Sequence, residues 1–168
     1  MSWSLKNFRS NVSSIGLDQY FTIDIPDSFL GSDLVTAIAR STELPSKTLE
    51  TQTISYYGAD IKVGSKANYG DWTVTFLDEH ESGLRDNFLF WVEKVYETDS
   101  LYNNSHIDYK SNDVVVYKHN PSGENKSGVR FYGMFPTQVG PISLNHTGGN
   151  VNTFDVTFAY DYFTRELE

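Results

Sequence analysis

The chain has 168 residues, of which 39% are apolar and 15% aromatic, so it is long enough to bury one hydrophobic core. It contains no cysteine, which excludes a disulfide framework, a thiolate metal site and a cysteine nucleophile. A formal net charge of −9 argues against a protein that grips nucleic acid, because phosphate binding needs clustered lysine and arginine. We therefore expect a single domain over residues 1–168. No apolar run has the length of a signal peptide or a membrane span, so we expect the chain to stay where it is made.

The first 19 residues carry a short amphipathic pattern of Leu5, Phe8, Val12 and Ile15, which predicts a short helix or an arm that docks on a neighbour. Residues 20–25 then alternate between apolar and polar side chains up to a proline, which predicts the first strand. Further strands are predicted at 48–57, 59–63, 71–77, 113–119, 129–135, 142–144 and 151–162, with a turn at 64–69. Short strands bounded by Gly, Asn and Pro favour an antiparallel sandwich or barrel.

One long helix interrupts the strands. Apolar residues recur at spacings of three and four within residues 79–96, namely Leu84, Phe88, Trp91, Val92 and Val95. Asp78 is the expected N-cap, and Glu81 follows three residues later, as in a capping box. The polar segments 97–112 and 120–128 are predicted to be loops.

The alternation within two predicted strands separates an apolar face from a polar face. The apolar set, together with two helical residues, is the expected core: Trp72, Val74, Phe76, Phe88, Trp91, Phe154, Val156 and Phe158. The polar set is Thr73, Thr75, Thr153, Asp155 and Thr157. Composition alone favours a sandwich with one solvated side; the alternative is a face that lines the bore of a closed ring.

The carboxylates and histidines give little support for a catalytic or metal site. Carboxylate pairs such as Asp24 with Asp27, or Glu79 with Glu81, can serve a glycosidase, but exposed acids in turns and at helix starts are far commoner. The histidines, at 80, 106, 119 and 146, show no metal-ligand spacing. We expect no catalytic residue, no metal site and no cofactor.

Three blocks of sequence resemble the tail tube proteins of contractile-tailed bacteriophages. They are GMFPTQVG at 133–140 followed by NTFDVTFAYDY at 152–162, YGDWTVTF at 69–76 leading into LRDNF at 84–88 and Trp91, and TELP at 42–45 after an early strand. The order and spacing of the blocks make this resemblance specific, because no single block is a catalytic motif. The type VI secretion tube protein is similar in fold to this family.

The resemblance implies a mainly β fold of two packed antiparallel sheets flanked by one helix, at about 79–96, that closes into a β-barrel on hexamerisation. It implies that Thr73, Thr75, Thr153, Asp155 and Thr157 face the lumen. It also implies that loops connect one ring to the next, with Leu44, Pro45, Ser46, Ile54, Tyr56, Tyr57 and the 64–69 turn as candidates. Residues 163–168 are expected to form a C-terminal tail.

The function expected from the resemblance is that of a structural subunit of the tail tube, in the virion, through which DNA is ejected inside a contractile sheath. The implied partners are other copies of the chain in stacked hexameric rings, the tail sheath protein, baseplate and tube-terminator proteins, and DNA that passes without specific binding. Alternatives are a tube subunit of a protein-secretion or toxin-delivery injection system, a baseplate ring protein of the same fold, or a small sandwich hydrolase or carbohydrate-binding module.

Overall fold

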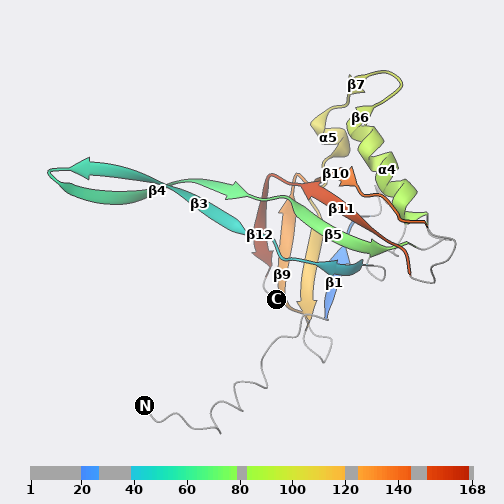
Figure 1. The fold of residues 1–168 in the computed structure, drawn as a ribbon, viewed down its shortest axis with the longest axis horizontal. Coiled ribbons are helices and arrows are strands. Elements are labelled where there is room, and N and C mark those ends of the chain that lie inside the picture. The colour runs from blue at the N-terminus through green and yellow to red at the C-terminus, as the bar shows by residue number, and fades with distance from the viewer. Residues whose placement is uncertain (1–19, 27–38, 79–82, 120–124, 145–150, 167–168) are drawn as a thin grey trace, which may run out of the picture.

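The computed structural model describes residues 20–26, 39–78, 83–119, 125–144 and 151–166. Two four-stranded antiparallel sheets face each other, and a two-stranded arm extends well beyond them (Figure 1). One longer helix, α4, flanks the sheets. The mainly β architecture predicted from the sequence, with two antiparallel sheets and a flanking helix, is thereby confirmed.

The sheets are named here after one strand of each. The β8 sheet has the order β1-β8-β9-β12, with β1 at Phe21–Asp24, β8 at Val114–His119, β9 at Asn125–Tyr132 and β12 at Tyr162–Glu166. The β5 sheet has the order β10-β11-β5-β2, with β10 at Phe135–Val139, β11 at Thr153–Ala159, β5 at Trp72–Leu77 and β2 at Ala39–Thr42. In Figure 1 the strands of one sheet cross those of the other at a steep angle, as in orthogonal sheet packing.

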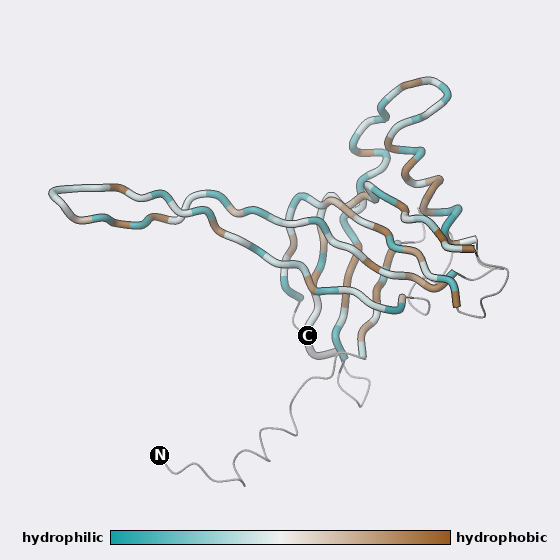
Figure 2. The backbone as a smooth tube through the Cα atoms, viewed as in Figure 1, coloured by the Kyte–Doolittle hydropathy of each residue, from teal (hydrophilic) through white to brown (hydrophobic). Residues whose placement is uncertain are grey.

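The core lies between the two sheets and under the helix. All eight residues expected in the core are buried: Trp72, Val74, Phe76, Phe88, Trp91, Phe154, Val156 and Phe158. Aromatic rings connect the layers, because Trp72 of the β5 sheet stacks on Phe131 of the β8 sheet with ring centroids 4.6 Å apart. Figure 2 shows hydrophobic residues distributed along the strands of both sheets around this core.

The helix α4 spans Leu84–Val95 and buries Leu84, Phe88 and Trp91. The prediction that Asp78 is its N-cap is wrong: the N-cap is Gly83, in the left-handed conformation with φ 56°. Asp78 instead donates its backbone N–H to the carbonyl of Asn152 at 2.9 Å, which extends the ladder between β5 and β11. The expected capping partner, Glu81, lies outside the described residues.

The segment 97–112, predicted to be a loop, contains short regular elements. They are β6 (Tyr96–Glu97), β7 (Tyr102–Asn103) and α5 (His106–Tyr109). The indole of Trp91 anchors this segment, since its Nε1 donates to the carbonyl of Tyr109 at 2.7 Å. Within the described residues, no helix combines the length and apolarity needed to cross a bilayer.

The arm is formed by β3 (Lys47–Tyr56) and β4 (Ala59–Tyr69), paired antiparallel. The predicted turn at 64–69 is therefore wrong, because these residues complete a strand much longer than the expected 59–63. Residues 43–46 connect β2 to the arm, and residues 70–71 connect the arm to β5, so the arm extends that strand pair past the end of the β5 sheet (Figure 1).

Two predicted strands are each broken in two. The strand expected at 129–135 ends at Tyr132 and restarts at Phe135, across Gly133 with φ 64°. The strand expected at 151–162 breaks at Asp161, so that β11 belongs to one sheet and β12 to the other. The segment expected to be a C-terminal tail, 163–168, contains most of β12, and the predicted strand at 142–144 is wrong, since no strand forms there. The amphipathic pattern of residues 5–15 lies outside the described residues.

Candidate assembly surfaces

The polar residues of β5 and β11 form one continuous face of the β5 sheet, opposite the core. The pairing of β5 with β11 places Thr73 beside Thr157 and Thr75 beside Asp155. The two threonine hydroxyls lie 3.2 Å apart, and the Thr75 hydroxyl donates to a carboxylate oxygen of Asp155 at 2.6 Å. Thr153 lies on the same side by alternation, opposite Leu77. These residues, Thr73, Thr75, Thr153, Asp155 and Thr157, are called the hydroxyl face below.

The edge strands of the sheet widen this face. Ser41 of β2 pairs with Thr75, and Gln138 of β10 pairs with Thr157, so both lie beside the hydroxyl face. The sequence did not predict that either residue lies at this face. It gave no sign that β2 belongs to this sheet, and it predicted one strand at 129–135 where the structure has β9 and the start of β10. Asp155 supplies the one carboxylate among the ladder-paired residues of the face, so its polarity comes mainly from hydroxyl and amide groups.

Helix α4 lies on the other side of the β5 sheet. Phe88 packs against Phe76 and Phe158, with ring centroids 5.1 and 5.8 Å apart, and these two residues point away from the hydroxyl face. The helix and the β8 sheet therefore cover one side of the β5 sheet and leave the hydroxyl side uncovered among the described residues. If this face lines a channel, the helix lies on the outside of the wall.

The arm exposes a set of large apolar side chains along its outer half. Ile54 pairs with Ile61, and these side chains are 56% and 59% exposed; Tyr56 and Val63 are also exposed. At the tip, Tyr57 and Gly58 have φ values of 49° and 82°, the conformation of a type I′ hairpin turn. Figure 2 shows hydrophobic stretches near the outer end of the arm.

The predicted stacking residues separate into two groups. Ile54, Tyr56 and Tyr57 lie at the outer end of the arm, where the Tyr57 side chain is 93% exposed. Leu44, Pro45 and Ser46 lie at the opposite end, between β2 and the start of the arm. The structure thus supplies two separate surfaces rather than one cluster.

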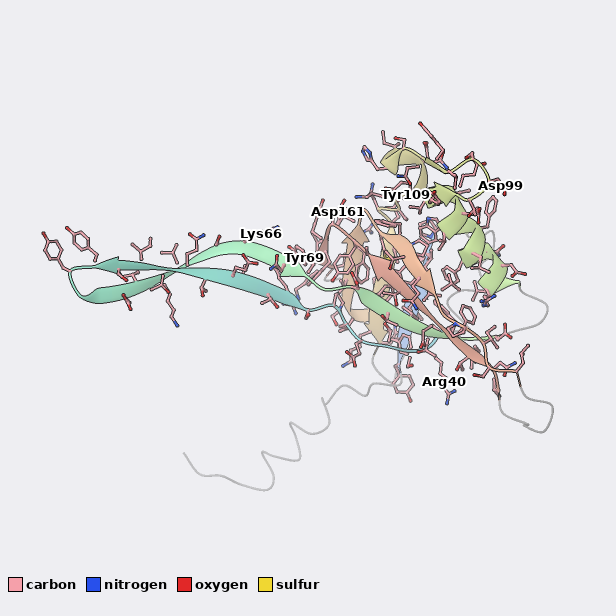
Figure 3. The ribbon with its side chains drawn as sticks, turned by 45° about the horizontal axis from the view of Figure 1, so that its top comes forward. Arg40, Lys66, Tyr69, Asp99, Tyr109 and Asp161 are labelled. Atoms are coloured by element: carbon pink, nitrogen blue, oxygen red, sulfur yellow. The ribbon has the colours of Figure 1, made fainter. Side chains whose placement is uncertain are left out.

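Aromatic contacts hold the base of the arm against the body. Tyr69, at the end of β4, lies where the arm meets the body (Figure 3). Its ring centroid is 5.5 Å from that of Phe163 and 6.1 Å from that of Tyr160. On the other side of the base, the Trp72 Nε1 donates to the carbonyl of Glu43 at 2.8 Å. Burial raises the pKa of Tyr160, with smaller contributions from Asp71 and Tyr69.

Charged groups form ion pairs on the β8 sheet and beside it. Arg130 binds Glu166 at 2.5 Å and Asp113 at 3.1 Å, and its hydrogen bond to Glu166 is the main cause of its raised pKa. Lys110 pairs with Asp161 at 2.8 Å. Among the described residues, no group of three or more His, Asp and Glu side chains is placed to hold a metal ion.

A family model described as phage tail tube protein matches residues 3–166 of the chain. The tail tube protein gp19 of Enterobacteria phage T4 is 26% identical over 145 residues, which cover 85% of this chain and 87% of that protein. Two solved structures share the fold. The tube-terminating cap of the anti-feeding prophage has a TM-score of 0.72, with 13% identity and 92% of each chain covered. A chain from the PVC sheath-tube complex of an extracellular contractile injection system has a TM-score of 0.58, with 16% identity over 99% of this chain and 100% of that one.

Proposed function

The chain belongs to the phage tail tube protein family, and from this premise we propose that six copies join their β5 sheets into a closed ring whose hydroxyl face lines a central channel. The observation that carries the proposal is a polar face that no described residue covers, on a sheet whose edge strands β2 and β10 have no further strand beside them in the described part of the chain. The described residues add only an isolated bridge between Ser111 and Met134, just before β10. Small hydroxyl side chains make such a wall hydrated and low in positive charge. A DNA chain can slide along it because none of the five residues of the hydroxyl face is a lysine or arginine that would bind the phosphates.

The even number of strands in the β5 sheet supports closure of identical subunits into a ring. Its four strands alternate in direction, so the two edges, β10 and β2, run in opposite directions. Placing β2 of one subunit beside β10 of the next therefore continues the antiparallel pattern across every joint. Closing the ring removes all edges of this sheet and with them the risk of uncontrolled strand addition.

The arm is proposed to connect successive rings. An isolated two-stranded ribbon is marginally stable in water, and this one exposes Ile54, Tyr56, Ile61 and Val63. Its ten-residue strand β3 spans roughly 33 Å, enough to reach past the rim of its own ring. A subunit of the next ring would cover these four apolar side chains. Leu44, Pro45 and Ser46, at the base of the arm, would form a second contact between the rings.

The remaining partners follow from this arrangement. Helix α4 would lie on the outside of the wall, where the tail sheath protein surrounds the tube, while baseplate and terminator proteins would cap its two ends. We also propose that residues 1–168 form one tail-tube domain, which is supported by the match over 3–166 and by the shared core of the two sheets. In this role the chain needs neither catalysis nor a cofactor, and it would be a component of the virion, assembled in the host cytoplasm.

Negative-stain electron microscopy of the purified protein over a range of concentrations tests the proposal. Hollow tubes or six-fold rings are the expected result. If the protein stays dispersed alone and also when purified baseplate is added as a template, the ring proposal is wrong.

A further inference from the structure

The outer edges of the β5 sheet, on β2 and β10, carry backbone groups that point away from their neighbouring strands and have no strand beside them among the described residues. We propose that β2 of one subunit pairs with β10 of the next in a single register, with Ala39 opposite Val139 and Thr42 opposite Pro136. The inference rests on the proposed ring and adds which backbone groups meet at each joint.

The ladder between β5 and β11 fixes the direction of every backbone group in the sheet. The bond from the Asp78 nitrogen to the Asn152 carbonyl flanks the pair of Leu77 and Thr153. Such a flanking bond marks a non-hydrogen-bonded pair, in which the backbone N–H and C=O groups of the two residues point away from each other. Along an antiparallel ladder these pairs alternate with hydrogen-bonded pairs, in which the two residues exchange both bonds. The pairs that exchange hydrogen bonds between β5 and β11 are therefore Phe76 with Phe154, Val74 with Val156, and Trp72 with Phe158.

This alternation determines which backbone N–H and C=O groups of β10 point away from β11. Val156 and Phe158 use their backbone groups toward β5, so they cannot bond their partners on the other side, Val139 and Pro136. The bond from the Gly140 nitrogen to the Asp155 carbonyl, at 2.7 Å, flanks the pair of Val139 and Val156 and gives the same result independently. The backbone groups of Val139 and Pro136 thus point out of the sheet, and Pro136 has no N–H to offer.

The same reasoning applies to β2 on the opposite edge. Phe76 and Val74 bond toward β11, so their partners in β2, Ala39 and Thr42, are not hydrogen-bonded to β5 at these positions. The N–H and C=O groups of Ala39 and Thr42 consequently point out of the sheet.

The two edges match each other in spacing. Each presents two outward residues three positions apart, and each has a register shift between them, after Ala39 in β2 and after Pro136 in β10. Because the strands run in opposite directions, only one register brings both outward residues of β2 opposite both of β10. It also places the two-residue stretches that contain the shifts, residues 40–41 and 137–138, opposite one another.

The faces of the sheet agree with this register. Ala39 and Thr42 pair with the buried residues Phe76 and Val74, and Val139 and Pro136 pair with the buried residues Val156 and Phe158. All four side chains therefore lie on the core side of the sheet. Ser41 and Gln138, beside the hydroxyl face, are then diagonal neighbours across the joint on the channel side.

The joint forms three backbone hydrogen bonds rather than four. Ala39 and Val139 exchange two, and the Thr42 nitrogen donates to the Pro136 carbonyl. Pro136 cannot return a bond to the Thr42 carbonyl. A proline on an edge strand is also a known obstacle to unspecific strand addition, so β10 is protected in the free subunit.

Cysteine cross-linking tests the register, since the chain contains no cysteine of its own. Facing residues of a hydrogen-bonded antiparallel pair have Cα atoms about 5.5 Å apart, within disulfide range. A residue displaced by three positions lies about 10 Å along the strand from the facing position, so its Cα atom is about 11 Å away and cannot be bridged. The two edges of one subunit are three strand spacings, or about 14 Å, apart, so any disulfide between them joins different chains.

The variant Ala39→Cys with Val139→Cys would be assembled, its rings verified by electron microscopy, oxidised and run on a non-reducing gel. Thr42→Cys with Val139→Cys is the matched control, because it uses the same β10 cysteine and the alternative outward residue of β2. Mixing the single variants A39C and V139C should give cross-linked dimers only. Melting curves of each variant would show that the fold is kept.

The expected result is a ladder of cross-linked species up to the hexamer for A39C/V139C, with at least about tenfold less cross-linking for the control. Stronger cross-linking of the control, or no cross-linking of either variant in verified rings, overturns the register while leaving the ring intact. If neither the wild-type protein nor any variant forms rings, alone or on a template, the proposed ring fails and the register with it.

Discussion

At the scale of single residues, Trp72 connects the core to the arm. Its indole stacks on Phe131, and its Nε1 donates to the carbonyl of Glu43 just before the arm begins. Trp72→Ala removes both contacts and leaves a large cavity, so we expect the free energy of unfolding to fall by about 3–5 kcal/mol. Urea denaturation followed by circular dichroism would measure this.

Trp72→Phe is the matched control for that prediction. It keeps most of the ring but loses the hydrogen bond, so its cost should be clearly smaller. Equal losses for both variants would mean that the hydrogen bond to the arm base, not packing, dominates.

Tyr160 carries a buried hydroxyl for which the described residues offer no hydrogen-bond partner. Burial raises the pKa of this hydroxyl above its ordinary value of 10.0. Above about pH 10 the unfolded chain therefore loses this proton while the folded chain still holds it, and the free energy of unfolding falls as pH rises. Tyr160→Phe should flatten that alkaline loss and should leave stability at pH 7 unchanged or up to about 1 kcal/mol higher.

Denaturation of wild type and Y160F at pH 7 and at alkaline pH would check this prediction. Tyr162→Phe is a suitable control, because Tyr162 is 45% exposed and stacks on Tyr132 at the surface. A marked loss of stability in Y160F at pH 7 would show that the hydroxyl has a partner outside the described residues.

At the scale of secondary-structure elements, the arm separates folding from assembly. None of the residues of β3 is buried, so its outer half contributes no core. Ile54→Asp with Ile61→Asp should change the stability of the subunit by no more than about 0.5 kcal/mol, yet abolish tubes and leave single rings. Melting curves and electron microscopy would measure the two effects.

The polar side of the same ribbon provides the control. Thr53 pairs with Lys62 there, and Thr53→Asp with Lys62→Asp should leave stacking largely intact if the apolar side makes the contact. Tubes of normal length from I54D/I61D would contradict the assignment of the arm to stacking.

The sequence predicted those elements best that have one buried face. Trp72, Val74 and Phe76 alternate with threonines, and this strand and its core face were correctly predicted because period-two burial leaves that pattern. Of the arm, β3 was predicted almost in full, whereas β4 was predicted only to residue 63. Neither face of the arm packs on the core of its own subunit, so its sequence lacks the pattern of apolar residues that a core imposes.

Strand breaks were missed for a different reason. At Gly133 the chain leaves one sheet and enters the other, although the flanking residues read as one strand. A Cβ at this position would collide with the Asp161 carboxylate, at the break between β11 and β12. The two corners thus meet in space, and a contact between residues so distant in sequence leaves no local signal. For the same reason the polar residues of β5 and β11 could be placed on one face from sequence, but Ser41 and Gln138 could not.

At the scale of the whole molecule, the charge of the hydroxyl face should govern DNA passage without affecting assembly. Asp155→Lys with Thr157→Lys adds up to twelve lysines to the channel of a proposed six-subunit ring and removes six carboxylates. We expect tubes of normal length but infectivity lower by about an order of magnitude or more, because lysines bind the passing phosphates.

Plating efficiency of particles carrying the variant, together with tube lengths from electron microscopy, would measure this. Lysines placed on the exposed polar side of the arm, by Thr51→Lys with Thr53→Lys, control for added charge alone. Unimpaired infectivity of D155K/T157K particles would show that this face does not line the channel.

The arm is not a separate appendage, because β3 follows from β2 and β4 leads into β5. In the proposed tube, β2 also forms the seam between neighbouring subunits. A force that pulls two rings apart would thus be carried along the same peptide chains that hold each ring closed. The same chain segment would therefore resist both separation of the rings along the tube axis and opening of a ring at its joints. A tube of such subunits should fail by rupture of whole rings rather than by gradual loosening between rings.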